Sequence, residues 1–360
     1  MQYPAHGANP ATLYEKLGLA MPAQVIDLSE NVNHFGYPQS FADIWPTLLE
    51  KIQYYPHEDA EPLRSKLAFL HKVKTEHIVI GNGAAELLMA LSKLYANDKV
   101  AILHPSFSEY TRTLQQQNVQ IISIIVDDIA SYTLPMGEIK EAMRKARAIY
   151  FCNPNNPTGV VIQKEQLIEI ISFGEQVNCD VIVDEAFMDW TDESHSVINL
   201  VETYGHIFVM RSMTKMFSMA GVRLGYCLSQ QAATLKSNLP HWNVSGVAIE
   251  LGLQALEEGV FCEKSRKYAQ EMRERITQFL LDNGCIVTQS ETNYIAFCLP
   301  KYLDATDFYL SLLKEGIVLR HTQNFIGMDG QWFRLALKDE WKMEQFKGKF
   351  LNYANNNLSR

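Results

Sequence analysis

Short apolar runs alternate with helical stretches through the first two thirds of the chain. The strand candidates lie at residues 78–80, 100–103, 120–125, 148–152, 181–183 and 207–210. Helical patterns separate most of them, as residues 87–95 do after the first run. Continuous apolar strands alternating with helices are typical of a parallel sheet that is covered on both faces. The pattern therefore predicts an α/β fold with a large domain built on a mainly parallel sheet.

The last third of the chain has a different pattern. Residues 247–281 predict one long helix with a possible kink. Beyond it, strand candidates lie at residues 286–287, 294–298, 317–320 and 332–337. Helix candidates lie at residues 305–313 and from 340 onward. We therefore expect a large domain at residues 41–245 and a smaller α+β domain at residues 246–360.

The N-terminal region is irregular. Residues 1–40 are rich in Gly, Pro and Asn, which mark defined turns, and residues 41–75 look helical with a break at 54–56. We expect residues 1–40 to form an arm that packs with the small domain. Such an arm either caps the fold or closes over an active site.

Composition removes several classes of function. The 360 residues carry a formal net charge of -9, and no basic run interleaved with aromatics suggests a nucleic-acid partner. No His-x-x-x-His or Cys-x-x-Cys spacing predicts a metal site. The six cysteines lie mostly in apolar runs, as expected of reduced core residues in a cytoplasmic protein. No apolar run is long enough for a membrane span.

Residues that follow the predicted strands carry the candidate chemistry, because ligands bind at the carboxyl ends of strands in open α/β sheets. The small-residue turn at 81–85 precedes a helix and is either a phosphate-binding turn or only a tight turn. Phe107 follows another strand and could stack on a flat ring or belong to the core.

Two further strand ends present polar side chains. The prolines and glycine of residues 153–159 fix a loop that aims Asn156, whose amide could donate to a phenolic oxygen. Asp184 ends the apolar run 181–183 and needs a cationic partner if it is buried. A protonated pyridine nitrogen is one such partner, and capping of the next helix is the alternative role.

The segment 211–226 places Lys215 among small and hydroxylated residues after an apolar strand. A crowded lysine has a lowered pKa and becomes a nucleophilic amine that can form a Schiff base. Ser212 and Arg223 on either side could hold a phosphate. An ordinary surface lysine would be the alternative if this segment stood alone.

Taken together, these motifs resemble the fold-type I aminotransferase superfamily of pyridoxal phosphate (PLP) enzymes, and their order along the chain is that of the family. The resemblance implies an aspartate aminotransferase-like fold, a Schiff base between Lys215 and the cofactor, and pairing of Asp184 with the pyridine nitrogen. The other cofactor contacts that it implies are Gly83, Ala84, Ala85, Phe107, Asn156, Phe187, Ser212, Arg223 and Tyr55. Tyr55 matches a tyrosine that reaches the cofactor of a partner subunit, which implies a homodimer with a shared active site.

Within the superfamily, the chain is similar to the branch that holds histidinol-phosphate aminotransferase and L-threonine-O-3-phosphate decarboxylase. The opening at residues 6–9, the segment 27–33 and Phe187, where the aminotransferases usually have Tyr, favour the decarboxylase. Ala8 and Lys338 depart from its pattern. The implied reaction is PLP-dependent decarboxylation of L-threonine O-3-phosphate in cobalamin side-chain synthesis, and histidinol-phosphate transamination is the alternative. The substrate-binding residues that the resemblance implies are His6, Asn33, Asn156, Arg320 and Arg334.

Overall fold

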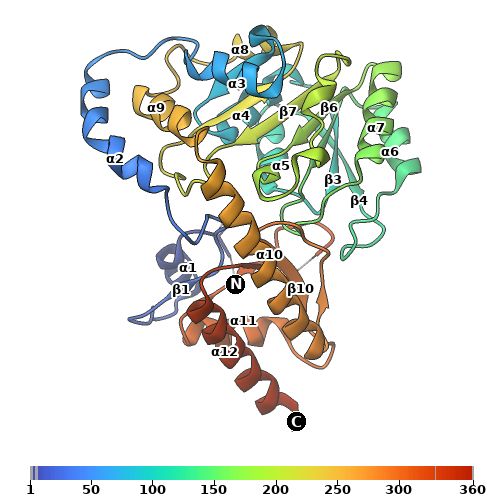
Figure 1. Cartoon of the computed structure of the whole chain (residues 1–360). Coiled ribbons are helices and arrows are strands. Elements are labelled where there is room, and N and C mark those ends of the chain that lie inside the picture. Colours follow the sequence, from blue (N-terminus) through green and yellow to red (C-terminus); the bar gives the residue numbers. More distant parts are fainter. Residues whose placement is uncertain (1–2, 5–6, 329, 359–360) are drawn as a thin grey trace.

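A seven-stranded sheet forms the centre of the computed structural model, which describes residues 3–4, 7–328 and 330–358 (Figure 1). Its strands run in the order β2-β8-β7-β6-β5-β3-β4. Their bounds are β2 Ile78–Gly81, β3 Lys99–His104, β4 Gln120–Ile125, β5 Ala148–Cys152, β6 Asp180–Asp184, β7 Ile207–Ser212 and β8 Gly225–Leu228. β8 runs antiparallel to its two neighbours, β2 and β7, and the other pairings in this sheet are parallel. The predicted α/β fold with a mainly parallel sheet is confirmed.

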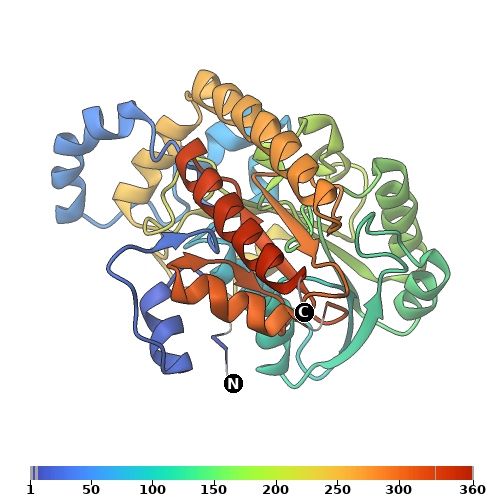
Figure 2. The ribbon, with the colours of Figure 1, turned by 90° about the horizontal axis from the view of Figure 1, so that it is seen from below.

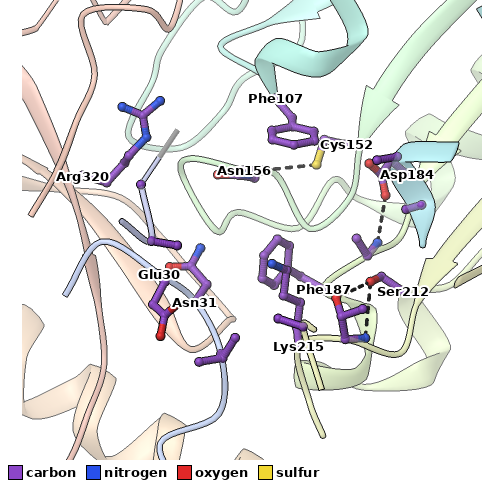
Figure 3. Close-up of a pocket in the computed structure, with 18 of the residues that line it drawn as sticks. Glu30, Asn31, Phe107, Cys152, Asn156, Asp184, Phe187, Ser212, Lys215 and Arg320 are labelled. Carbon is purple, nitrogen blue, oxygen red and sulfur yellow. Dashed lines mark hydrogen bonds between the residues drawn. The ribbon is translucent and has the colours of Figure 1, made fainter. Parts of the chain in front are cut away.

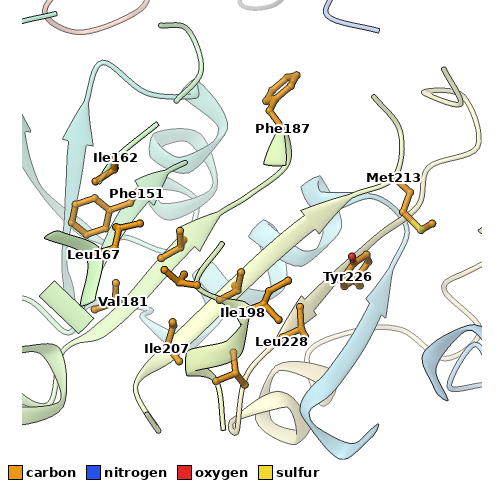
Figure 4. Close-up of a cluster of buried hydrophobic side chains, with 14 of the residues drawn as sticks. Phe151, Ile162, Leu167, Val181, Phe187, Ile198, Ile207, Met213, Tyr226 and Leu228 are labelled. Carbon is orange, nitrogen blue, oxygen red and sulfur yellow. The ribbon is translucent and has the colours of Figure 1, made fainter. Parts of the chain in front are cut away.

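Helices cover both faces of this sheet because its strands are apolar on both sides. In β6, Val181 and Val183 pack into one cluster, while Ile182 between them packs into the other. The first cluster, part of which Figure 4 shows, includes α3 (Leu63–His71), α6 (Met136–Met143), α7 (Lys164–Val177) and α9 (Gly246–Ala255). The second includes α4 (Ala84–Leu94), α5 (Ser108–Gln115) and α8 (Ala232–Lys236).

A second, antiparallel sheet has the order β12-β13-β10-β9. Its strands are β9 Ile286–Val287, β10 Tyr294–Cys298, β12 Arg320–His321 and β13 Trp332–Ala336. A separate core joins it to α10 (Gly259–Asp282), α11 (Ala305–Lys314) and α12 (Glu340–Leu358), which lie across the molecule in Figure 2. The expected domain boundaries at residues 40 and 245 stay a prediction.

The N-terminal segment lies beside these C-terminal elements (Figure 2). β1 (Ile26–Asp27) pairs in parallel with β11 (Ile317–Val318), and the hydroxyl of Tyr14 donates to the carbonyl of Leu313 at 2.6 Å. This segment also contains the helix α1 (Pro10–Leu17), which the sequence pattern did not predict. Asn9 caps α1 through a side-chain bond to the Thr12 amide, and Pro10 and Gly18 mark its two ends.

Elsewhere the structure departs from the predicted elements in several places, one of which is the strand expected at residues 317–320, which is divided into β11 and β12 in two different sheets. α2 (Gln39–Leu48) continues into a 3₁₀ turn, the expected long helix is divided into α9 and α10, and β8 was not predicted at all. The sequence pattern did not reveal β8 because its four residues include a glycine and follow the irregular part of the segment that contains Lys215. Among the described helices, none combines the length and apolar character that a bilayer span needs.

Candidate active site

The candidate active site is a pocket of about 270 Å³ between the carboxyl ends of the large sheet and the N-terminal and C-terminal segments (Figure 3). The predicted residues that line it are Ala84, Ala85, Phe107, Asn156, Asp184, Phe187, Ser212, Lys215, Arg223, Arg320 and Arg334. Residues from distant parts of the sequence therefore converge on one cavity, as strand ends do in open α/β sheets.

Asp184 lies at the buried end of β6 and is held in place from two sides. Its Oδ2 accepts from the Tyr110 hydroxyl at 2.6 Å, and its Oδ1 accepts from the Ala186 amide at 3.0 Å. Burial raises the pKa of Asp184 above its usual value, and these two hydrogen bonds oppose that shift. A cation bound next to Asp184 would stabilise the ionised carboxylate, which is what a protonated pyridine nitrogen supplies.

Lys215 follows β7 and faces the same pocket (Figure 3). Its pKa is lowered to about 8, mainly by burial and then by the charges of Arg334 and Arg223, while Glu30 and Asp184 act in the opposite direction. The backbone carbonyl of Lys215 accepts from the Asn33 amide at 3.1 Å. A substantial fraction of the amine is therefore neutral near pH 7.5, as a nucleophilic lysine requires.

A candidate phosphate cradle lies at the N-terminus of α4. Ala84 and Ala85 begin the helix, whose first N–H groups have no partner within the helix. Ser212 contributes a hydroxyl, which lies 2.8 Å from the hydroxyl of Thr214. Gly83 has φ 78°, and a Cβ there would lie 2.6 Å from a guanidinium nitrogen of Arg223. Gly83 therefore lets the arginine close over the cradle.

The opposite wall carries two buried arginines. Arg320 of β12 and Arg334 of β13 are directly paired across the strands, and burial lowers the pKa of Arg320 to about 9 and that of Arg334 to about 10. Arg334 donates to Asn156 Oδ1 at 2.6 Å and to the Ser29 carbonyl at 2.5 Å. Arg320 donates to Asn324 Oδ1 at 2.7 Å. Two like charges this close and this buried favour an anionic ligand between them.

Three predicted residues do not line the pocket, and a fourth cannot be placed. Asn33 is buried, but its amide donates to the Met216 carbonyl at 2.9 Å and to Ser265 Oγ at 2.8 Å. It ties the N-terminal arm to the loop of Lys215. Gly83 lies behind Arg223, and Tyr55 is 82% exposed beside Trp242. His6 lies outside the described residues.

Sequence reasoning missed several residues of the pocket. Asn31 lines it, and both polar atoms of its buried side chain lack a hydrogen-bond partner. Glu30 also lines the pocket and adds a carboxylate. Tyr110 lies three residues after Phe107 at the start of α5, so the helical spacing could have placed it near Asp184. Asn31 and Glu30 lie inside the segment 27–33, in which the family resemblance implied only Asn33.

The pocket fits the cofactor that the family resemblance implies. The helix N-terminus with Ser212 and Arg223 suits a phosphate, and Asp184 suits a ring cation. Phe107 lies on a wall where a flat ring could stack, and Lys215 offers the amine. Cys152 and Phe187 complete a mostly apolar surround for the ring.

Comparison with known proteins agrees with this geometry. The signature of the family "Aminotransferase class I and II" matches residues 23–349. The chain is 27% identical over 97% of its length to the threonine-phosphate decarboxylase of Salmonella typhimurium, covering 96% of that protein. It is 26% identical over 98% of its length to an adenosylcobalamin biosynthesis bifunctional protein of Leptospira interrogans, and it spans only 41% of that protein.

A solved structure gives a comparable similarity to the other branch. The histidinol-phosphate aminotransferase of Clostridium acetobutylicum superposes with a TM-score of 0.86 at 30% identity, covering 91% of this chain and 99% of that one. Relatives of both kinds thus match nearly the whole chain, and they differ in the reaction and substrate for which they are named.

Proposed function

The chain belongs to the aminotransferase class I and II family and uses pyridoxal 5'-phosphate, and on this basis we propose that it decarboxylates L-threonine O-3-phosphate to (R)-1-aminopropan-2-yl phosphate. The observation that carries the proposal is the buried pair of Arg320 and Arg334 on one wall of the pocket. The proposed substrate has two anionic groups, a carboxylate and a phosphate, and two arginines can hold both.

The cofactor, when bound, accepts the electron pair that the departing carboxylate leaves on the α-carbon. The residues of this chain would hold the substrate and transfer the proton. Arg334, fixed by Asn156 and the Ser29 carbonyl, would hold the carboxylate, and Arg320 would hold the phosphate. The carboxylate leaves as carbon dioxide, and one proton replaces it on the α-carbon. We assign that proton transfer to the amine of Lys215, which lines the pocket.

Asn31 supports the same assignment. Its unpartnered amide is buried on the substrate-facing wall, so a ligand that hydrogen-bonds to it would remove an unfavourable desolvation cost. A phosphate or carboxylate oxygen can accept from its Nδ2. Lys338 donates to the Val32 carbonyl at 3.2 Å, which fixes the backbone next to Asn31.

One observation favours the alternative, transamination of histidinol phosphate. Glu30 adds a negative charge to the pocket and would repel a substrate with two anionic groups. Histidinol phosphate has a single anionic group and an imidazole whose N–H could donate to Glu30. We therefore keep this aminotransferase activity as the second candidate.

We also propose that the chain forms a homodimer. The side chains of Trp45, Ile52, Tyr54, Tyr55 and Trp242 are large, apolar or aromatic, and exposed. Exposed apolar groups of this number mark an interface with another protein. The family resemblance implies that Tyr55 reaches the cofactor phosphate of the second copy, which supports this proposal. Light scattering of the purified protein at micromolar concentration should give twice the mass of one chain.

A paired product assay tests the proposed reaction. The PLP-loaded protein receives L-threonine O-3-phosphate without a keto acid in one reaction, and histidinol phosphate with 2-oxoglutarate in the other. We expect carbon dioxide and the amine product in the first reaction. Glutamate in the second reaction, without carbon dioxide in the first, would overturn the proposal and establish the aminotransferase.

A further inference from the structure

The imidazole of His321 lies next to one of the two buried arginines of the candidate active site. His321 follows Arg320 on β12, and only 5% of the residue is exposed. Two tyrosine rings pack near it, with centroids 4.6 Å away for Tyr3 and 6.2 Å away for Tyr309. The proposed reaction uses Arg320 and gives this neighbouring ring no task.

One ring nitrogen of His321 has two competing partners. Nε2 lies 2.9 Å from Nη1 of Arg320 and 3.1 Å from the backbone carbonyl oxygen of Pro4. A guanidinium can only donate a hydrogen bond, and a carbonyl oxygen can only accept one. Burial, and then the charge of Arg320, lower the pKa of His321 to about 3, so the ring is neutral at pH 7. Nε2 of a neutral ring either accepts or donates, and it can therefore serve only one of the two partners.

The two neutral tautomers of the ring satisfy different partners. With the proton on Nδ1, Nε2 accepts from Arg320, but the Nδ1–H group is then unpaired, because Nδ1 is buried without a hydrogen-bond partner among the described residues. With the proton on Nε2, the ring donates to the Pro4 carbonyl, and the N–H of Arg320 that points at the ring needs another acceptor. Each tautomer thus leaves one buried donor unpaired, which is costly.

The remaining contacts of Arg320 keep it at the wall of the pocket in either case. Its Nη1 also donates to the His321 carbonyl at 2.7 Å, and its Nη2 donates to Asn324 Oδ1 at 2.7 Å. The guanidinium carbon lies 4.9 Å from the centre of the Phe325 ring. Because Arg320 lines the active-site pocket, an anionic ligand there can be the acceptor that the second tautomer requires.

We propose that His321 is a positioning residue whose tautomer changes when Arg320 binds an oxyanion of the ligand. Without a ligand, the Nδ1–H tautomer holds Arg320 through Nε2. With a ligand, Nδ1 releases a proton to solvent and Nε2 takes one up, so the ring stays neutral and its N–H donates to the Pro4 carbonyl. The ligand-binding role of Arg320 rests on the proposed function, whereas the competition at Nε2 rests on the contacts of His321 alone.

Nitrogen NMR of the PLP-loaded protein with isotope-labelled histidine tests the proposal, because protonated and unprotonated ring nitrogens resonate at different frequencies. The signals of His321 are those that disappear in His321→Gln. We expect the Nδ1–H tautomer in the unliganded protein and the Nε2–H tautomer with saturating methyl phosphate, a phosphate monoester that the proposed reaction does not consume. The same tautomer in both spectra, or no calorimetric binding of methyl phosphate, would overturn the proposal.

An Arg320→Met variant tests the competition at Nε2 without any ligand. It removes the donor, so the ring should adopt the Nε2–H tautomer both with and without methyl phosphate. Arg275→Met is the matched control, because this exposed arginine is paired with Glu340 and lies outside the pocket lining. It should respond to methyl phosphate as the unchanged protein does. The Nδ1–H tautomer in Arg320→Met would contradict the proposal, whichever reaction the protein catalyses.

Steady-state kinetics with L-threonine O-3-phosphate add a second readout. His321→Phe should raise KM about fivefold and leave kcat within about twofold, because one hydrogen bond that orients Arg320 is lost. His321→Gln offers both an acceptor and a donor and should bring KM back to within about twofold of the unchanged protein. A lower kcat with unchanged KM would contradict the positioning role. Absence of carbon dioxide release by the unchanged protein would overturn the proposed reaction alone, because the tautomer measurements do not depend on turnover.

Discussion

The two sides of the pocket differ in how completely their polar groups are paired. One side, which we call the cofactor side, comes from the large sheet and includes Asp184, Ser212 and Lys215 (Figure 3). The other, the substrate side, comes from the N-terminal arm and the small sheet and includes Asn31, Arg320 and Arg334. Among the described lining residues, the buried polar atoms that lack a partner belong to Asn31 and Arg334 alone, both on the substrate side.

This difference in hydrogen bonding suggests a division between the chemistry of the cofactor and the choice of substrate. On the cofactor side, Tyr110 and a backbone amide hold Asp184 before any ligand binds, so the geometry is already organised. On the substrate side, unpaired polar atoms carry a cost that only a complementary ligand removes. We therefore propose that the cofactor side serves any reaction of the family and that the substrate side selects the molecule that reacts.

The largest effect should come from Lys215→Ala on the cofactor side. Turnover should fall by roughly a thousandfold or more, because the nucleophilic amine and the assigned proton carrier are both lost. PLP should still bind, since the phosphate cradle and Asp184 remain. Turnover and PLP binding by equilibrium dialysis check this. Lys140→Ala, which removes an exposed lysine paired with Glu169, should behave like the unchanged protein. Retained turnover in Lys215→Ala would contradict the assignment.

On the substrate side, Arg334→Met should lower kcat/KM by roughly 10- to 150-fold, because hydrogen bonds to a charged group are lost. PLP affinity should stay within about twofold, since Arg334 belongs to the substrate side. Steady-state kinetics and PLP titration measure the two quantities. Arg275→Met, an exposed arginine paired with Glu340, is the control. A loss of PLP affinity as large as the loss in kcat/KM would remove the distinction between the two sides.

The pH dependence of cofactor attachment should reflect the environment of Lys215. Attachment needs the neutral amine, and the lowered pKa of about 8 increases the neutral fraction below pH 10. The attachment rate to the apo protein should therefore rise about tenfold from pH 7 to 9 and then level off. Stopped-flow absorbance checks this. A rate that continues to rise with hydroxide above pH 9 would indicate an ordinary lysine.

The smallest effect should come from Tyr110→Phe. Loss of the 2.6 Å hydrogen bond raises the pKa of Asp184 further and should weaken PLP binding about fivefold. Tyr95→Phe is a matched control, because Tyr95 donates to Asp180 at 3.0 Å on the same strand but away from the pocket. Fluorescence titration with PLP compares the two variants. Equal affinities would mean that Tyr110 does not support Asp184.

The sequence predicted the cofactor side better than the substrate side for a physical reason. Phe107, Asn156 and Lys215 each follow a strand and Asp184 ends one, and parallel strand ends must meet at one edge of the sheet. The substrate side depends on how a short arm folds back over the small sheet, and no local pattern fixes that. Asn31 faces the pocket while Asn33, two residues later, turns toward Ser265. Such a choice depends on tertiary contacts.

Other features of the structure were not predicted from the sequence for similar reasons. α1 was missed because its end residues Asn9, Pro10 and Gly18 are also common in turns, and the sequence pattern of the arm was interpreted as turns. Glu30 gave no signal, since a lone acidic residue in an irregular segment is usually a solvated surface group.

The most direct test of the account is the fate of the α-carbon during the reaction. The PLP-loaded protein would be supplied with L-threonine O-3-phosphate in heavy water, and the product analysed by mass spectrometry and proton NMR. Decarboxylation replaces the carboxylate by one solvent proton, so we expect 1-aminopropan-2-yl phosphate with a single carbon-bound deuterium at C1. Recovery of the amino acid with its carboxylate intact, whether or not deuterium has exchanged into it, would contradict the proposed function.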